Sequence, residues 1–221
     1  MEIRLEEPAD YRAAEEVVRE AFWNLYAPGC DEHWLLHAMR SHPDFLPELD
    51  FVAVENGRIV GNIVYCRSSV VDVSGASLPV VTFGPVAVLP EFQGRGIGAA
   101  LIRHSLRVAK ELGHKAVFIY GYPAYYRRFG FAGGSRFGIG NGEGKYPTAL
   151  QGLELVEDAL RGVRGSFVES AVYHIDPAEV AAFDNGFTPK EKGFAESQRE
   201  FERMLVSFDE SPMVEGAIRE K

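Results

Sequence analysis

The chain has few cysteines, no excess of positive charge and no long apolar run. Cys30 and Cys66 are the only cysteines in 221 residues and lack metal-ligand spacing, so we expect reduced structural thiols and no metal. The net charge of −9 disfavours nucleic acid or an anionic membrane as partner, because both are bound mainly through cationic side chains. Neither a transmembrane span nor the cationic and apolar parts of a signal peptide are present. We therefore expect a cytoplasmic protein.

Apolar periodicity predicts an α/β chain in which helices and strands alternate. Asn56-Gly57 is the strongest hairpin signal. After residue 175 the pattern changes to short charged helices, so we expect a domain over 1–175 and a C-terminal extension over 176–221 packed on it, its last residues frayed. The expected strands are 3–5, 51–55, 58–71, 78–89, 115–120, 150–156 and 167–174, with one more near 137. The expected helices are 8–26, 32–40, 96–112, 124–129, 178–183 and 195–208.

The most informative segment is the glycine-rich turn at 93–99, Q-G-R-G-I-G-A, between a strand and a helix. Its glycines permit positive φ and remove the side chains that would keep a ligand away. The first amides of the helix are left unpaired there and carry the positive end of its dipole. The segment therefore predicts a site for a phosphate-bearing ligand. An ordinary glycine turn is the simpler alternative, but three glycines and Gln93 exceed what a turn requires.

From Gly94 onward, the same residues match a G-x-G-x-x-A dinucleotide fingerprint. That fingerprint needs an acidic residue about 20 positions later, at the end of the next strand. The strand at 115–120 ends in Y-G-Y-P, with no carboxylate. The context therefore disfavours a nucleotide-dependent oxidoreductase.

From Gln93 onward, the residues read Q-x-x-G-x-G, which resembles the coenzyme A pyrophosphate loop of the GNAT superfamily of N-acetyltransferases. Residues 51–65 resemble the central hairpin of that family, and residues 124–131, A-Y-Y-R-R-F-G-F, resemble its Tyr-x-x-x-Gly-Phe helix. Residues 82–90 and 121–131 together resemble the YhbS-like subgroup of predicted acetyltransferases. The resemblance implies the GNAT fold: a mixed, mostly antiparallel central sheet, splayed at the acetyl-CoA site and flanked by helices, here with a C-terminal helical extension.

The same resemblance implies transfer of the acetyl group of acetyl-CoA to a primary amine by direct attack. The strand end would offer backbone groups to the pantetheine arm, and an amide near Val88 would stabilise the oxyanion. The loop amides would hold the pyrophosphate, with Arg95 adding charge at the rim. The expected cofactor-binding residues are Val86, Ala87, Val88, Gly94, Arg95, Gly96, Ile97, Gly98 and Ala99.

Tyr126, four residues before Gly130, matches the general-acid tyrosine of the family and is the expected catalytic residue. It would protonate the leaving thiolate. A packing role is the alternative, and Tyr125 is a rival. Many relatives carry an Asn just before this helix, whereas this chain has Gly121-Tyr122-Pro123.

The sequence names no general base and no acceptor. His33, His37 and His42 border the expected acceptor cleft, and a water chain is an equal alternative. Segments 28–50 and 133–147 are expected to line the acceptor site. The extension either borders that site or only stabilises the domain or a dimer, the chain being a monomer or a homodimer. A non-catalytic acyl-CoA-binding sensor is the alternative function.

Overall fold

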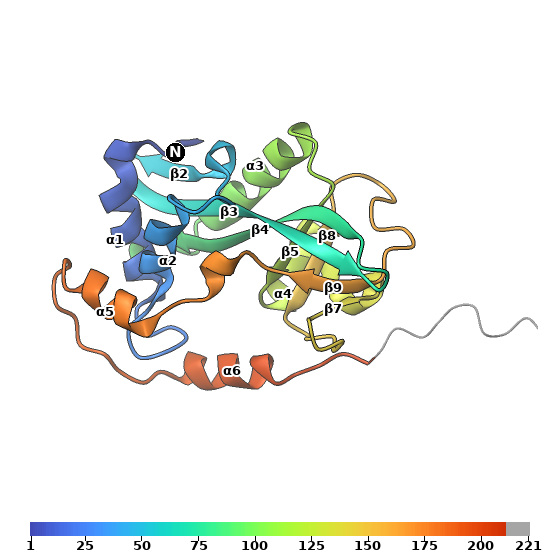
Figure 1. The fold of residues 1–221 in the computed structure, drawn as a ribbon. Helices are drawn as coiled ribbons and strands as arrows, with labels where there is room; N and C mark the ends of the chain where they lie inside the picture. The colour runs from blue at the N-terminus through green and yellow to red at the C-terminus, as the bar shows by residue number, and fades with distance from the viewer. Residues whose placement is uncertain (211–221) are drawn as a thin grey trace, which may run out of the picture.

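The computed structural model describes residues 1–210, so the frayed end expected at 211–221 lies outside the described residues. One twisted sheet forms the centre, in the order β1-β2-β3-β4-β5-β8-β6, while β9 pairs with β3 and β7 pairs with β9 (Figure 1). The strands are β1 (Glu2–Leu5), β2 (Phe51–Glu55), β3 (Arg58–Asp72), β4 (Ser77–Val88), β5 (Ala116–Tyr120), β6 (Ala132–Gly133), β7 (Ile139–Gly140), β8 (Leu150–Glu154) and β9 (Gly165–Val168).

Most neighbouring strands are antiparallel, and within residues 1–210 only the pairs β4–β5 and β7–β9 are parallel. The β2–β3 hairpin turns at Asn56 and Gly57, whose φ angles of 52° and 77° suit the right-handed twist of the strands. These features confirm the predicted fold, a mixed and mostly antiparallel sheet flanked by helices.

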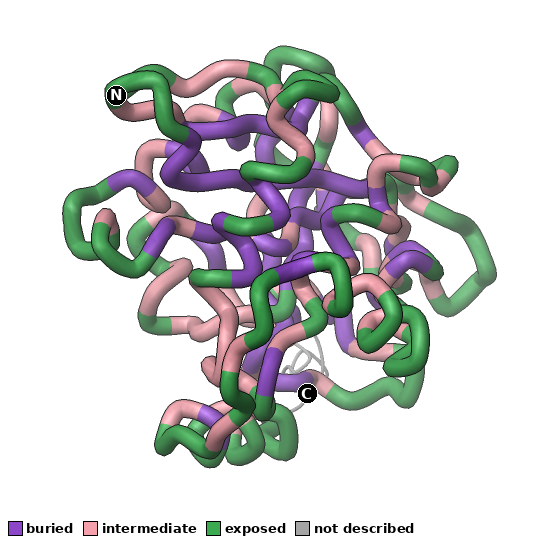
Figure 2. The backbone as a smooth tube through the Cα atoms, turned by 90° about the vertical axis from the view of Figure 1, so that its left-hand side faces the viewer, coloured by how far each residue is buried: buried purple, intermediate pink, exposed green. Residues whose placement is uncertain are grey.

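Helices cover both faces of the sheet (Figure 1). α1 and α2 pack on one face, and α3 packs on the other, where Ile97 and Leu101 lie against Gly61 of β3. Figure 2 shows that burial is concentrated in the sheet and that the periphery is exposed. The helices are α1 (Tyr11–Phe22), α2 (Glu32–Met39), α3 (Ile97–Glu111), α4 (Pro123–Tyr126), α5 (Pro177–Asp184) and α6 (Glu196–Leu205). None of them is long and apolar enough to cross a bilayer.

Several predicted element boundaries are wrong: β8 ends at Glu154 instead of 156, α6 ends at Leu205 instead of 208, and three further elements differ as follows. The first helix ends at Phe22, not near residue 26, because Asn24 has a φ of 60° and its side-chain oxygen accepts the amide of Gly29. β9 ends at Val168, and a 3-10 turn follows in which the Ser170 hydroxyl accepts the amide of Val172. The residues near 137 form a 3-10 turn, and the strand expected there is β7.

The described part of the C-terminal extension, residues 176–210, lies along the molecule and contacts it at several points (Figure 1). In α6, Gln198 donates its side-chain amide to the carbonyl of Asn24 at 3.0 Å. At its far end, Asp209 accepts the hydroxyls of Ser135 and Thr148, each at 3.0 Å. α6 therefore spans from the loop after α1 to the segment before β8.

Candidate functional site

β4 and β5 pair at one point and then separate. Their register contains only Val81 with Val117, so the last residues of β4 have no strand on that side within the described chain. Between the β3–β4 pairs, Gly84 and Pro85 of β4 stand opposite Val64 alone, which makes a bulge. A bulge bends its strand and increases the local twist. The bend leaves an open edge of β4 toward β5.

The glycine loop begins where this open edge ends. The side-chain amide of Gln93 donates to the carbonyl of Val88 at 3.0 Å and so ties the loop to β4. Gly94 and Gly96 have φ angles of 74° and 83°, which a residue with a β-carbon adopts only at a cost. The hydrogen bond of Gln93 and the positive φ angles of Gly94 and Gly96 explain why the loop needs both the glutamine and the glycines.

The amides at the start of α3 have no cap. Gly96 is the N-cap residue, it has no side chain to cap the helix, and the first intrahelical bond comes from Ala100 to Gly96. A β-carbon on Gly94 or Gly96 would meet no atom within 4 Å, so the loop is open to a ligand. Arg95 is exposed and donates to the carbonyl of Glu91 at 2.8 Å, which places its charge at the rim. This cradle suits a diphosphate.

The end of β4 and the start of α3 lie next to each other at Val88 and Gly98. A β-carbon on Gly98 would lie 3.5 Å from a methyl group of Val88 and 3.4 Å from the hydroxyl oxygen of Tyr125. Ala87 is buried, whereas Val86 and Val88 are half-buried beside the open edge. The nine residues expected to bind the cofactor thus follow one continuous path along β4 and the first turn of α3.

Tyr126 ends α4 on the other side of the opening. Its ring is half-buried against Phe83 and Phe131, with centroids at 5.9 and 5.6 Å. Burial raises the pKa of Tyr126, and the neighbouring phenols Tyr125 and Tyr26 raise it further, so the hydroxyl keeps its proton. Among residues 1–210 its hydroxyl makes no hydrogen bond, which leaves it free to act as a donor to a ligand.

Tyr125 has a different position. Its ring is perpendicular to that of Tyr126, with centroids 5.1 Å apart, and Arg128 lies over it at 4.5 Å. Its hydroxyl points to the first turn of α3 near Gly98, not to the core ring cluster of Tyr126. The two adjacent tyrosines therefore face different parts of the opening.

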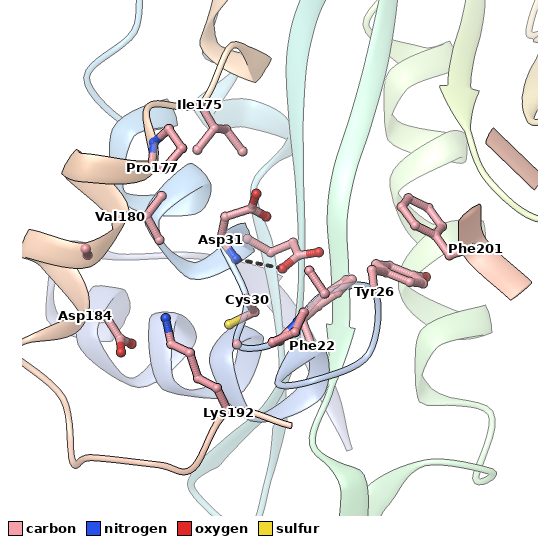
Figure 3. Close-up of a pocket in the computed structure, with 15 residues that line it drawn as sticks. Phe22, Tyr26, Cys30, Asp31, Ile175, Pro177, Val180, Asp184, Lys192 and Phe201 are labelled. Carbon is pink, nitrogen blue, oxygen red and sulfur yellow. Dashed lines mark hydrogen bonds between the residues drawn. The ribbon is translucent and has the colours of Figure 1, made fainter. Parts of the chain in front are cut away.

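A cavity of about 390 Å³ lies between the loop after α1 and the C-terminal extension (Figure 3). Tyr26 and Phe201 form an aromatic wall, with ring centroids 4.4 Å apart. Of the two segments expected to line the acceptor site, 28–50 contributes its first residues, whereas 133–147 contributes none. The phenol of Tyr26 contributes to the raised pKa of Tyr126.

Sequence reasoning missed Asp31 and Glu32, two of the three carboxylates that line this cavity. The backbone amide of Asp31 donates to the Glu32 carboxylate at 3.2 Å (Figure 3). Burial and the charge of Asp31 raise the pKa of Glu32 to about 8. The signal available in the sequence was their place directly after the helix break at Pro28-Gly29, at the start of α2.

The three histidines considered as bases lie elsewhere and do not line the cavity. His33 is fully buried, 3.1 Å from Asp184, and burial lowers its pKa to about 4. His37 lies 2.9 Å from Glu15, and His42 lies 3.6 Å from Asp44. Residues 1–210 contain no group of three side chains suited to a metal.

The comparisons with known proteins agree with this geometry. Residues 2–133 match the acetyltransferase (GNAT) domain family. An uncharacterized N-acetyltransferase of Escherichia coli, YhbS, is 32% identical over 75% of this chain and 93% of its own. The crystal structure of E. coli YhbS with CoA superposes with a TM-score of 0.69 and 28% sequence identity. The match covers 79% of this chain and 92% of that one. The crystal structure of a GNAT family acetyltransferase from Brucella melitensis with acetyl-CoA superposes with a TM-score of 0.62 and 28% sequence identity. The match covers 78% of this chain and 97% of that one. The predicted resemblance is confirmed, and this chain belongs to the GNAT family of acetyltransferases.

Proposed function

We propose that this protein transfers the acetyl group of acetyl-CoA to a primary amine by direct attack. The observation that carries the proposal is the joint position of the uncapped α3 terminus, the open edge of β4 and the free hydroxyl of Tyr126 around one opening. The relatives crystallised with CoA and acetyl-CoA support this assignment of the ligand.

Each part of the opening has a separate task. The amides of Ile97, Gly98 and Ala99 donate to the pyrophosphate, and Arg95 adds charge. The backbone of Val86 to Val88 holds the pantetheine arm, and the amide near Val88 donates to the oxyanion, an effect of about 3 kcal/mol in other acyl-transfer enzymes. Acetyl-CoA supplies the activated acetyl thioester.

Tyr126 donates its proton to the departing sulfur. A thiol ordinarily has a pKa near 8.5, far below that of a buried phenol. The proton therefore has to move while the carbon–sulfur bond breaks, because transfer to a free thiolate would be uphill. This coupling requires the hydroxyl to be held at the sulfur throughout the step.

Calorimetry with acetyl-CoA, CoA, NAD and ATP, followed by thiol release with a panel of amines, tests the proposal. We expect binding of acetyl-CoA and CoA only, and thiol release that depends on the amine. Binding of NAD or ATP in place of acetyl-CoA would overturn it. Binding of acetyl-CoA without turnover of any amine would instead identify the acyl-CoA sensor.

We further propose that residues 1–175 form the catalytic domain and that the extension from 176 belongs to its acceptor side. Ten hydrogen bonds join residues 184–198 to α1 and the loop after it, among them those from Arg19 to Asp184 and from the Trp23 indole to the carbonyl of Glu191. A cytoplasmic location and a monomer or homodimer stay predictions.

A further inference from the structure

The cavity between the α1–α2 loop and the C-terminal extension has a charge pattern that the acetyl-CoA site does not explain. Asp31 and Glu32 lie side by side on it, and residues 1–210 place no Lys, Arg or His in an ion pair with either carboxylate. Asp184, by contrast, forms an ion pair with Arg19 at 2.6 Å and lies 3.1 Å from the ring of His33. The cavity thus holds two adjacent carboxyl groups that are paired with no cation among residues 1–210.

Apolar side chains lie on both sides of these carboxyl groups. Tyr26 and Phe201 stack on each other on one side, and Ile175 and Val180 lie on the other (Figure 3). Aromatic faces attract cations as well as hydrocarbon. Lys192 also lines the cavity, with its side chain over Gly29, and it forms no ion pair within residues 1–210. The volume of about 390 Å³ lies in the range of small-molecule sites, about 300 to 1,000 Å³.

We propose that this cavity is the acceptor site and takes a small cationic amine with an aromatic or aliphatic body. The carboxylates of Asp31 and Glu32 bind the ammonium group, and Tyr26 and Phe201 hold the body. This inference rests on the proposed function, since it names the acceptor class of the same reaction. It gives the extension a task, because Phe201 supplies half of the aromatic wall.

Ionisation favours the cation further. The pKa of Glu32 is raised because the protein interior and Asp31 both oppose a second negative charge. An ammonium group beside it removes that penalty, so binding of a cation and ionisation of Glu32 favour each other. A neutral ligand of the same shape gains nothing from this coupling.

The test uses a quaternary ammonium as the probe, because it carries a permanent positive charge and its nitrogen cannot be acetylated. Benzyltrimethylammonium is titrated into the full-length enzyme by calorimetry, with benzyl alcohol as the uncharged match. We expect the cation to bind and Glu32→Gln to weaken it at least about ten-fold, a loss of about 1.4 kcal/mol. Asp31→Asn should weaken it too, and Phe201→Leu should weaken both probes.

Glu179→Gln is the matched control, because Glu179 is exposed on α5, does not line the cavity and changes the net charge equally. It should leave the Kd of benzyltrimethylammonium unchanged. Equal Kd values for the wild type, Glu32→Gln and Asp31→Asn would overturn the proposal, and so would the absence of binding to the wild type at about 10 mM.

Acetyl-CoA titrations separate this inference from the proposed function. If acetyl-CoA binds and amines are turned over, but Glu32→Gln leaves the Kd of benzyltrimethylammonium unchanged, only the acceptor assignment fails. If acetyl-CoA does not bind, the proposed function fails whatever the cation does. In the activity arm, 2-phenylethylamine should have a higher kcat/KM than phenylalanine, whose carboxylate would face Glu32.

Discussion

The ring of Tyr126 lies directly on Gly121, in the space that a β-carbon on Gly121 would occupy. Gly121 follows β5, so the absence of its side chain fixes where the phenol can lie relative to the sheet. This contact gives a physical reason for the glycine at position 121.

We expect Gly121→Ala to push the Tyr126 ring away and lower kcat by about ten-fold or more, with little change in the Kd of acetyl-CoA, because the glycine loop is untouched. Steady-state kinetics and calorimetry measure the two quantities. Gly142→Ala is the matched control, since a β-carbon there meets no atom within 4 Å and its φ is not positive. An unchanged kcat in Gly121→Ala would argue against a positional role for Tyr126.

Tyr126→Phe keeps the ring packing and removes only the proton. We expect kcat to fall by about 10²- to 10⁴-fold while the Kd of acetyl-CoA barely changes. Tyr125→Phe is the control and should be much milder in kcat, because its hydroxyl faces the first turn of α3. A Tyr126→Phe enzyme with wild-type kcat on its true acceptor would show that another group protonates the sulfur.

Gly98→Leu places a side chain beside Val88 and Tyr125, in the gap where the pyrophosphate would lie. We expect the Kd of acetyl-CoA to rise at least about ten-fold, because the helix amides become inaccessible. Lys110→Leu, on the exposed side of the same helix, should bind normally. If Gly98→Leu is folded by circular dichroism and still binds acetyl-CoA with unchanged Kd, the loop is not the cofactor site.

Asp184→Asn should destabilise the protein by about 3 kcal/mol in urea unfolding, because it leaves the buried Arg19 without its carboxylate. Although burial opposes it, the hydrogen bond and charge of Arg19 lower the pKa of Asp184. The stabilisation is therefore complete above the ordinary value of 3.8 and is lost as the pH falls below it. Glu20→Gln, in an exposed pair with Lys190, should change little at any pH.

The binding of benzyltrimethylammonium should strengthen as the pH rises from 6 to 9, because Glu32 ionises near pH 8. The other groups facing the cavity change little in this window: burial raises the pKa of Tyr26 to about 12 and that of Cys30 as well, while Asp184 is ionised throughout.

Asp31 and Lys192 also face Glu32, so the pH profile of Glu32→Gln is the reference. It should be flatter than that of the wild type. The raised pKa also predicts that ionising Glu32 destabilises the fold as the pH rises from 4.5 to about 8, so Glu32→Gln should have the higher Tm at pH 9. Parallel pH profiles for both proteins would exclude Glu32 as the titrating group.

The sequence alone determined the features that depend on neighbouring residues. The hairpin at Asn56-Gly57, the glycine turn before α3 and the short helix ending at Gly130 all follow from backbone preferences within a few positions. These local signals, together with the resemblance to the GNAT family that they carry, predicted the fold and selected Tyr126 and the loop as candidates. The bulge at Gly84-Pro85 in β4, and the separation of β4 from β5, became visible only in the structure.

Only the tertiary structure decided what distant segments do together. The cavity joins residues 22–32 to residues 175–201, and no local pattern connects segments that far apart. His33 could serve as a base by its chemistry, yet Asp184 and the extension bury it. In the sequence, Glu32 is an ordinary carboxylate at the start of a helix. In the folded protein it lines a cavity with Asp31, the aromatic wall and the extension, and its pKa is raised. Burial and charge at a site are sums over contacts that the chain makes only after it has folded.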